Sequence, residues 1–320
     1  MIGRRRTMAV KRLMRVALRA LSYTDIGEKE SERLHRTVIR IRGLHLGKLP
    51  YQTWDHVVSY ENHDIPVRIF APGENRPDSL LIFFHGSGWV AGTIDGYNRI
   101  CANMANMTGS TVVSVDYRLA PEYHFPAAPE DCYRVVREIF LHTELLKVPA
   151  EKITVAGDSA GGNLAAAVSL MARDRGEFLP ERQILIYPST YSDHTTKSPY
   201  ASVRDNGSKY LLTSKSICDY MKLYQASDED LQNPYFAPLA SKDFSRQPKT
   251  LIITAEYDPL RDEAEDYGQR LKEAGNEVEV RRIPGALHGF FSLPPVFRQV
   301  RECYRLIDDF LNREGEGKAL

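Results

Sequence analysis

Ser159 is the residue whose surroundings most clearly suggest chemistry. It lies in GDSAGGN, Gly157 to Asn163, between the β-branched run KITVA and the alanine-rich stretch NLAAAVSLMA. A strand, a sharp turn and a helix around a G-x-S-x-G pattern describe a nucleophile elbow, in which the serine is exposed to a carbonyl carbon. The glycines would let neighbouring backbone pass without a clashing Cβ. A serine that caps a helix after a glycine turn has the same letters, so the motif alone leaves both interpretations open.

A nucleophilic serine needs a base, and the base needs a carboxylate that fixes its tautomer. Of the nine histidines only His194 and His288 follow the serine. His288 lies in PGALHGFF after the last predicted strand, and Asp258 lies in EYDPL at the carboxyl end of the strand before it. The order Ser159, Asp258, His288 predicts a catalytic triad. Asp262 is the alternative acid, although its position also fits a charge at a helix N-terminus.

Acyl transfer also develops an oxyanion, which needs hydrogen-bond donors fixed in advance. The segment HGSGW, residues 85–89, follows the apolar run LLIFF and offers backbone N–H groups. The N–H of Ala160, next to the candidate nucleophile, would supply another donor. We therefore predict an oxyanion hole from these two segments.

A competing interpretation of the same glycines is a dinucleotide-binding fingerprint. Gly86, Gly88 and Ala91 spell G-x-G-x-x-A after a strand, and Asp116 ends the next predicted strand. However, GTIDGYN separates the glycines from the next predicted helix, and Trp89 would crowd a pyrophosphate. We therefore expect no nicotinamide cofactor, and no metal.

Composition restricts the remaining function classes. The net charge of zero gives no general attraction to nucleic acid. Cys101, Cys132, Cys218 and Cys303 have no zinc-site or C-x-x-C spacing, which is typical of thiols in a cytoplasmic protein. No apolar run is long enough to span a membrane.

The N-terminus is strongly basic, with arginines and lysines throughout residues 4–19 and no acid before Asp25. These charges interrupt any apolar core, so a secretory signal is not expected. Apolar residues recur at helical spacing, which predicts an amphipathic helix with a basic face. We expect its apolar stripe to pack on the protein itself, and contact with an anionic membrane surface is the alternative.

Apolar runs and helical stretches alternate along the rest of the chain. The runs are DHVVSY, IPVRIFAP, LLIFFHG, TVVSVDYR, KITVAGDS, ILIYPS, TLIITAEYD and EVEVRRIPG. The middle six are continuous, as expected for parallel strands covered on both faces. Helices are predicted at about residues 99–107, 129–146, 164–175, 263–274 and 297–312. This alternation predicts an α/β fold with a mostly parallel eight-stranded sheet.

One interval interrupts the alternation. Some sixty residues without a clear strand lie between ILIYPS and TLIITAEYD, with a predicted helix over Ser214 to Tyr224. A structureless loop of that length is improbable, so this segment is predicted to be a helical insertion. Together with the N-terminal helix, this insertion is a candidate lid.

Several ordered motifs together resemble the hormone-sensitive-lipase-like branch of the α/β-hydrolases. HGSGW stands where that family has HGGGW or HGGGF, and DYRLAPEYHFPAAPED, GDSAGGN, DPLRDE and HGF also match. The resemblance implies an α/β-hydrolase fold and a serine carboxylesterase without metal or cofactor. It implies Ser159 as nucleophile, His288 as base and then acid, and Asp258 as its orienting carboxylate. Ser87, Gly88 and Ala160 would donate to the oxyanion, while Gly86 and His85 shape the loop. Residues 1–48 and 189–247 would form a cap over a catalytic domain of residues 49–188 and 248–320.

Ser87 departs from the family pattern, because it replaces the middle glycine of the oxyanion loop. If that position needs a positive φ, the serine is strained by about 1 to 2 kcal/mol. Its backbone donor would survive.

The prediction is a carboxylesterase that prefers short acyl chains, with a small acyl ester as its partner. Assembly as a homodimer is left open. The alternatives are an amidase or peptidase with the same triad, and a hydrolase-fold protein that binds a small ligand without turnover.

Overall fold

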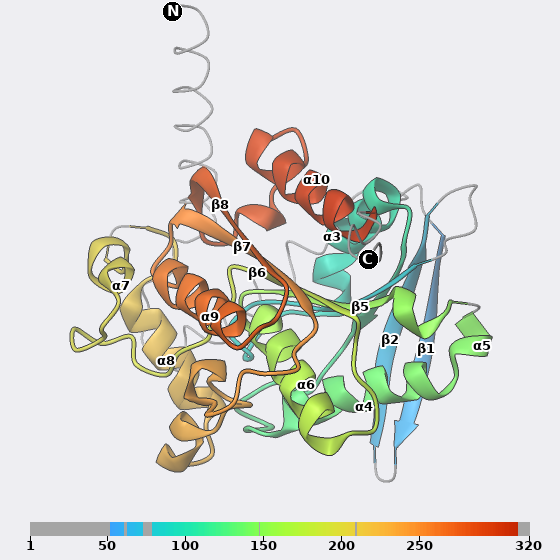
Figure 1. The fold of residues 1–320 in the computed structure, drawn as a ribbon, viewed down its shortest axis with the longest axis horizontal. Helices are drawn as coiled ribbons and strands as arrows, with labels where there is room; N and C mark the ends of the chain where they lie inside the picture. Colours follow the sequence, from blue (N-terminus) through green and yellow to red (C-terminus); the bar gives the residue numbers. More distant parts are fainter. Residues whose placement is uncertain (1–51, 61–62, 73–78, 147, 209, 313–320) are drawn as a thin grey trace, which may run out of the picture.

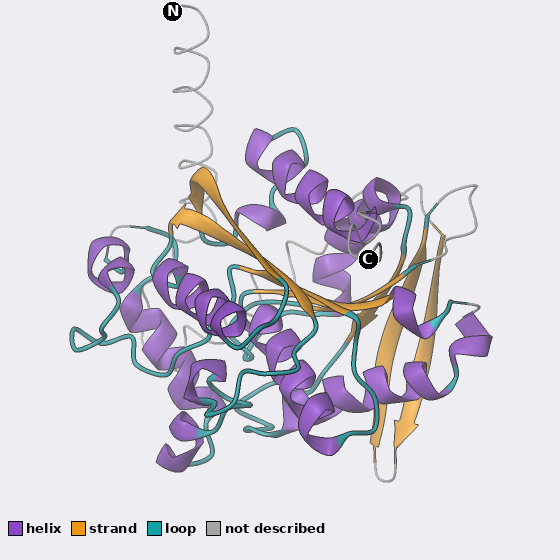
Figure 2. Cartoon of the chain, in the orientation of Figure 1, coloured by secondary structure: helices purple, strands orange, loops and turns teal. Residues whose placement is uncertain are grey.

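A computed structural model describes residues 52–60, 63–72, 79–146, 148–208 and 210–312 of the 320-residue chain. Its centre is an eight-stranded sheet in the order β1-β2-β4-β3-β5-β6-β7-β8. Helices α3 and α10 cover one face, and α4, α6 and α9 cover the other (Figures 1 and 2). Each face has its own apolar core. The predicted α/β class and the mostly parallel sheet are confirmed.

The eight strands agree with the eight predicted apolar runs. They are β1 Gln52–Tyr60, β2 His63–Ala71, β3 Leu80–Phe84, β4 Thr111–Val115, β5 Ile153–Asp158, β6 Arg182–Ile186, β7 Lys249–Tyr257 and β8 Val278–Leu287. The strands from β4 through β3 to β8 pair in parallel. Their carboxyl ends therefore point to one edge of the sheet, where α/β proteins bind ligands.

The second strand corrects one prediction. β2 was expected among the parallel strands, but it pairs antiparallel with both β1 and β4. Tyr60 pairs with His63, so the β1–β2 connection is too short for a parallel crossover. Ile65 and Val67 are buried, whereas the intervening Pro66 is exposed. This alternation is the pattern of a half-covered antiparallel strand.

The helices flanking the sheet lie at the places of the five predicted stretches, but one of these stretches forms two helices. They are α3 Ile94–Thr108, α4 Ala127–Leu141, α5 Thr143–Leu146, α6 Ala160–Arg175, α9 Arg261–Glu273 and α10 Arg298–Asn312. α3 begins inside GTIDGYN, earlier than the predicted start at Arg99, because Thr93 Oγ1 accepts a hydrogen bond from Gly96 N at 3.0 Å and caps the helix. The predicted helix over residues 129–146 is divided at His142.

The insertion between β6 and β7 is helical. It contains α7 Ala201–Asn206, α8 Ser214–Tyr224 and the 3₁₀ turns η2 Asp228–Gln232 and η3 Pro238–Ala240, with no strand among its described residues. α8 has the bounds predicted for it. In Figure 1, α7 and α8 lie beside α9. Residues 1–48, the other predicted part of the cap, lie outside the described residues, so a two-part cap stays a prediction.

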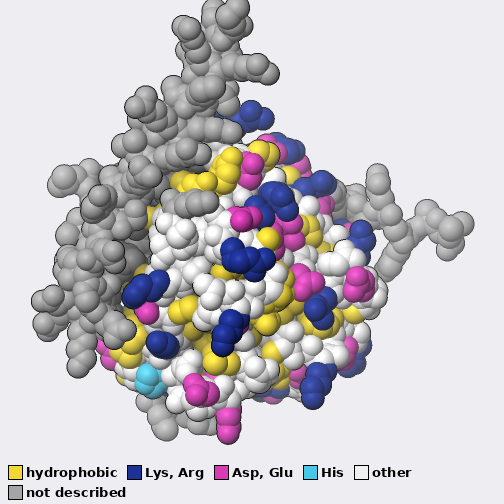
Figure 3. Space-filling model, turned by 90° about the vertical axis from the view of Figure 1, so that its left-hand side faces the viewer, with side chains coloured by type: hydrophobic (Ala, Val, Ile, Leu, Met, Phe, Trp, Pro, Cys, Tyr) yellow, Lys and Arg dark blue, Asp and Glu magenta, His cyan; other side chains and the backbone are white. Residues whose placement is uncertain are grey.

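On the face shown in Figure 3, basic and acidic side chains are interspersed. Within the described ranges, no helix has the length and apolar character needed to cross a bilayer. The predicted basic N-terminal helix lies outside the described residues.

Candidate active site

Ser159 lies in the turn between β5 and α6, as the sequence predicted. Its backbone has φ 56° and ψ −119°, a conformation that a residue with a side chain rarely adopts. The glycines on either side of Ser159 allow neighbouring backbone to approach the turn closely. A Cβ on Gly157 would lie 2.2 Å from the carbonyl oxygen of Gly161, and a Cβ on Gly161 would lie 1.9 Å from the carbonyl oxygen of Phe84. The turn therefore requires glycine at both positions.

His288 and Asp258 follow the ends of β8 and β7, and both lie beside this turn. His288 Nε2 is 2.9 Å from Ser159 Oγ, and His288 Nδ1 is 2.7 Å from Asp258 Oδ2. Asp258 is fully buried, and its Oδ1 accepts a hydrogen bond from Leu260 N at 2.9 Å. The three side chains of the predicted triad are thus joined by hydrogen bonds.

The alternative acid and the second histidine are directed elsewhere. Asp262 Oδ2 accepts a hydrogen bond from Ser202 N at 2.7 Å, and its Oδ1 pairs with Arg261. His194 is buried in the insertion against Glu263. In this geometry Asp258 is the carboxylate in contact with His288.

Both predicted oxyanion segments adjoin the nucleophile turn, since a Cβ on Gly86 would lie 2.7 Å from the carbonyl oxygen of Asp158 and Ala160 directly follows Ser159. Ser87 has φ 97° and Gly88 has φ 67° in the loop after β3. Ala160 opens α6, so its N–H has no partner within the helix. The N–H of Gly86 instead donates to Asp158 Oδ1 at 2.8 Å. Gly86 therefore shapes the loop, while the other N–H groups remain the candidate donors.

Ser87, which replaces a glycine of the family pattern, has a positive φ. At φ 97° a side chain is strained, so the expected strain of about 1 to 2 kcal/mol applies here. The Ser87 hydroxyl interacts with the hydroxyl of Tyr97, and Tyr97 also accepts a hydrogen bond from Gly86 N at 3.0 Å. These contacts help to hold the loop in its strained form.

Asp158, the residue before the nucleophile, is a feature that the sequence analysis missed. It is buried, and Tyr97 and Tyr187 each donate a hydrogen bond to its Oδ2 at 3.2 Å. Burial raises the pKa of Asp158 to about 6, and the hydrogen bond from Gly86 N and the nearby His288 lower it in part. Asp158 connects the nucleophile turn to the oxyanion loop. No sequence pattern predicts this connection, because Gly86 and Tyr97 are far from Asp158 in the chain.

Trp89 connects the oxyanion loop to the insertion. Its ring stacks on Tyr224 of α8 with the ring centroids 4.7 Å apart. Its Nε1 donates to Asn163 Oδ1 at 3.3 Å, and Asn163 Nδ2 donates to the carbonyl oxygens of Ser189 and Phe236. The insertion, the oxyanion loop and the nucleophile helix therefore form one packed unit.

A serine in a strand–turn–helix elbow, joined to a histidine and an aspartate at the carboxyl ends of a parallel sheet, defines a serine hydrolase of the α/β-hydrolase class. The family model described as alpha/beta hydrolase fold matches residues 81–292. The chain belongs to the hormone-sensitive-lipase-like carboxylesterase family of the α/β-hydrolases, as its motifs predicted.

Individual relatives agree with this membership. An arylesterase of Saccharolobus solfataricus is 38% identical over 250 residues, which cover 78% of this chain and 80% of the relative. An ethyl acetate hydrolase of Pseudomonas putida is 33% identical, covering 79% and 80%. The solved structure of a hyperthermophilic esterase from the archaeon Pyrobaculum calidifontis has a TM-score of 0.83 at 34% identity, covering 92% of this chain and 96% of that one.

Proposed function

We propose that this carboxylesterase hydrolyses short-chain acyl esters through an acyl-enzyme formed on Ser159. The observation that carries the proposal is the hydrogen-bonded series from Ser159 Oγ through His288 to Asp258. Such a series activates a hydroxyl that is otherwise a poor nucleophile.

Acylation would begin with attack of Ser159 Oγ on the ester carbonyl carbon. The hydroxyl proton passes to His288 Nε2, and Asp258 stabilises the resulting imidazolium. The N–H groups of Ser87, Gly88 and Ala160 would bind the oxyanion of the tetrahedral intermediate. Collapse of that intermediate expels the alkoxide, which takes the proton from His288 and leaves as an alcohol.

Deacylation would repeat these steps with water as the nucleophile. His288 takes a proton from water as the hydroxyl attacks the acyl carbon, and it then returns the proton to Ser159 Oγ. The products are a carboxylic acid and the regenerated serine. The scheme is built from side chains and backbone donors of this chain.

The name of one relative supports short acyl chains, and contacts of the insertion show what covers the oxyanion loop. One relative is named an ethyl acetate hydrolase, and that substrate carries a two-carbon acyl group. In addition, the ring of Tyr220 from α8 lies close over Gly88, where a Cβ would be 2.7 Å from the ring. The insertion therefore closes one side of the oxyanion loop. The names of the relatives favour esters over amides, so neither an amidase nor a non-catalytic binding protein is proposed.

The predicted cytoplasmic location also stays a proposal. All four cysteines are free thiols, which fits a reducing compartment.

A series of p-nitrophenyl esters with acyl chains of two to sixteen carbons tests the function. We expect kcat/KM to be highest for acetate or butyrate and to fall for long chains. Ser159→Ala should lower kcat by about 10⁴-fold or more. A maximum at long chains would overturn the acyl preference, and full activity in Ser159→Ala would overturn the mechanism.

A further inference from the structure

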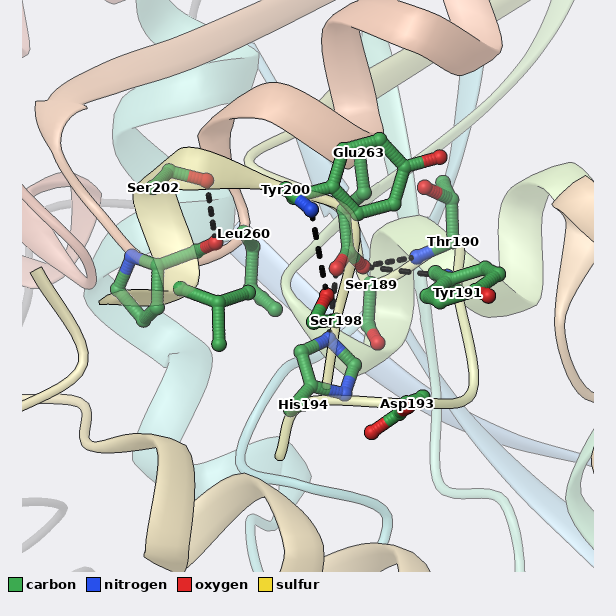
Figure 4. Close-up of polar contacts among 12 residues, drawn as sticks. Ser189, Thr190, Tyr191, Asp193, His194, Ser198, Tyr200, Ser202, Leu260 and Glu263 are labelled. Carbon is green, nitrogen blue, oxygen red and sulfur yellow. Dashed lines mark hydrogen bonds and ion pairs between the residues drawn. The ribbon is translucent and has the colours of Figure 1, made fainter. Parts of the chain in front are cut away.

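Glu263 and His194 form a buried pair that the proposed mechanism does not use. Both side chains are fully buried, and His194 Nε2 lies 2.6 Å from Glu263 Oε2. The other carboxylate oxygen of Glu263 accepts hydrogen bonds from Thr190 N at 2.8 Å and Tyr191 N at 3.2 Å. Figure 4 shows Glu263 held between the histidine ring and these two backbone groups. The pair therefore fastens the start of the insertion to α9.

The histidine makes this contact with one nitrogen. Among the described residues, His194 Nδ1 has no hydrogen-bond partner. A carboxylate only accepts hydrogen bonds, so Nε2 must be the donor in the pair. Tyr200 interacts electrostatically with Glu263, and Cys218 interacts with the backbone of His194 and with Asp193. A buried pair of this kind adds little net stability, but it favours one geometry over its alternatives.

Glu263 lies in the first turn of α9, directly after the loop that carries Asp258. On the other side of this loop, α7 of the insertion holds the same backbone. Ser202 Oγ donates to Pro259 O at 2.8 Å, and Asn206 Nδ2 donates to Asp258 O at 3.1 Å. The loop of Asp258 is thus enclosed between α9 and α7, and the Glu263–His194 pair holds the segment that leads into α7 against α9.

We propose that Glu263, paired with His194, is a positioning residue for the triad carboxylate. By fixing the start of the insertion on α9, the pair keeps α7 against the Asp258 loop. Asp258 then stays oriented toward His288 Nδ1. This inference depends on the proposed function, since it concerns the same triad.

Replacement of Glu263 by glutamine tests the inference. Glutamine has a single acceptor oxygen, which can face either His194 or the N–H groups of Thr190 and Tyr191. It therefore cannot accept all the hydrogen bonds that the Glu263 carboxylate accepts, in a side chain of nearly the same size. We expect kcat per active site, counted by fluorophosphonate titration, to fall about tenfold while KM changes little. The acid limb of the kcat/KM profile should move to lower pH, because a misoriented Asp258 stabilises the imidazolium less.

Two variants at position 194 separate positioning from packing. In His194→Gln the amide can still donate to Glu263, so kcat and the acid limb should stay near wild type. In His194→Leu the donor is absent, so both should change as in Glu263→Gln. If Glu263→Gln does not fold, the comparison of the two position-194 variants provides the same test.

Glu265→Gln is the matched control for charge. It removes a carboxylate from the same helix, but Glu265 pairs with Arg282 of β8 and accepts from Thr254 of β7. We expect its kcat and acid limb to match wild type.

Three results would overturn the inference. The first is a lower melting temperature of Glu263→Gln with an unchanged kcat and pH profile. The second is a raised KM of Glu263→Gln with an unchanged kcat. The third is a fall in kcat of Glu265→Gln as large as that of Glu263→Gln. If wild type neither turned over esters nor reacted with the fluorophosphonate, the proposed function itself would fail.

Discussion

His288 Nδ1 lies 2.7 Å from Asp258 Oδ2, and this contact supports Asp258 as the third member of the proposed triad. Asp258→Asn should lower kcat by up to about 10⁴-fold, because an amide cannot fix the tautomer in which Nε2 accepts the serine proton. Steady-state hydrolysis of p-nitrophenyl butyrate measures the loss.

The matched control is Asp262→Asn. Asp262 contacts Ser202 and Arg261, so its replacement should have a much smaller effect on kcat. The reverse order of the two losses would move the acid role to Asp262.

Ser87 provides a test of backbone strain in the oxyanion loop. Ser87→Ala removes the hydroxyl but keeps a Cβ at φ 97°, whereas Ser87→Gly removes both. We expect the free energy of unfolding of Ser87→Gly to exceed that of Ser87→Ala by about 1 kcal/mol, since glycine relieves the strain but has more entropy when unfolded. Urea denaturation of the two variants measures the difference. A glycine variant less stable than the alanine variant would show that the loop is not strained at this position.

Asp158 should make the stability of the protein depend on pH. Burial raises its folded pKa from 3.8 to about 6, so the folded state binds more protons than the unfolded state between these values. As the pH rises through this window, the contribution of Asp158 to the free energy of unfolding therefore falls by about 3 kcal/mol in total. Asp158→Asn cannot ionise and serves as the reference.

The measurement is urea denaturation of both proteins from pH 4 to pH 7.5. The free energy of unfolding of wild type, relative to Asp158→Asn, should fall between about pH 4 and pH 6 and then level off. A relative stability that stayed constant or rose across this window would refute the raised pKa.

The sequence predicted the features whose signals are local. Continuous apolar runs such as LLIFF mark the inner parallel strands, and the glycines around Ser159 mark the turn. Asp258 and His288 could be proposed because each follows a recognisable strand, and the carboxyl ends of parallel strands meet at one edge.

The features that sequence reasoning missed depend on contacts between distant residues. The antiparallel pairing of β2 with β4 joins segments far apart in the chain, and the apolar run of β2 resembles those of the inner strands. Asp158 reaches Gly86, and Glu263 reaches His194, across long stretches of chain. A polar residue carries no periodic signal that names its partner, so these contacts appear only when the sheet has been assembled.

The most direct test of the account is covalent labelling by a fluorophosphonate, followed by peptide mapping. An activated serine displaces fluoride and keeps the phosphonyl group, whereas an ordinary surface serine does not react. We predict one adduct per chain on the peptide that contains Ser159, and none in Ser159→Ala. An enzyme that hydrolyses esters but carries its adduct on another residue, or carries none, would contradict the account.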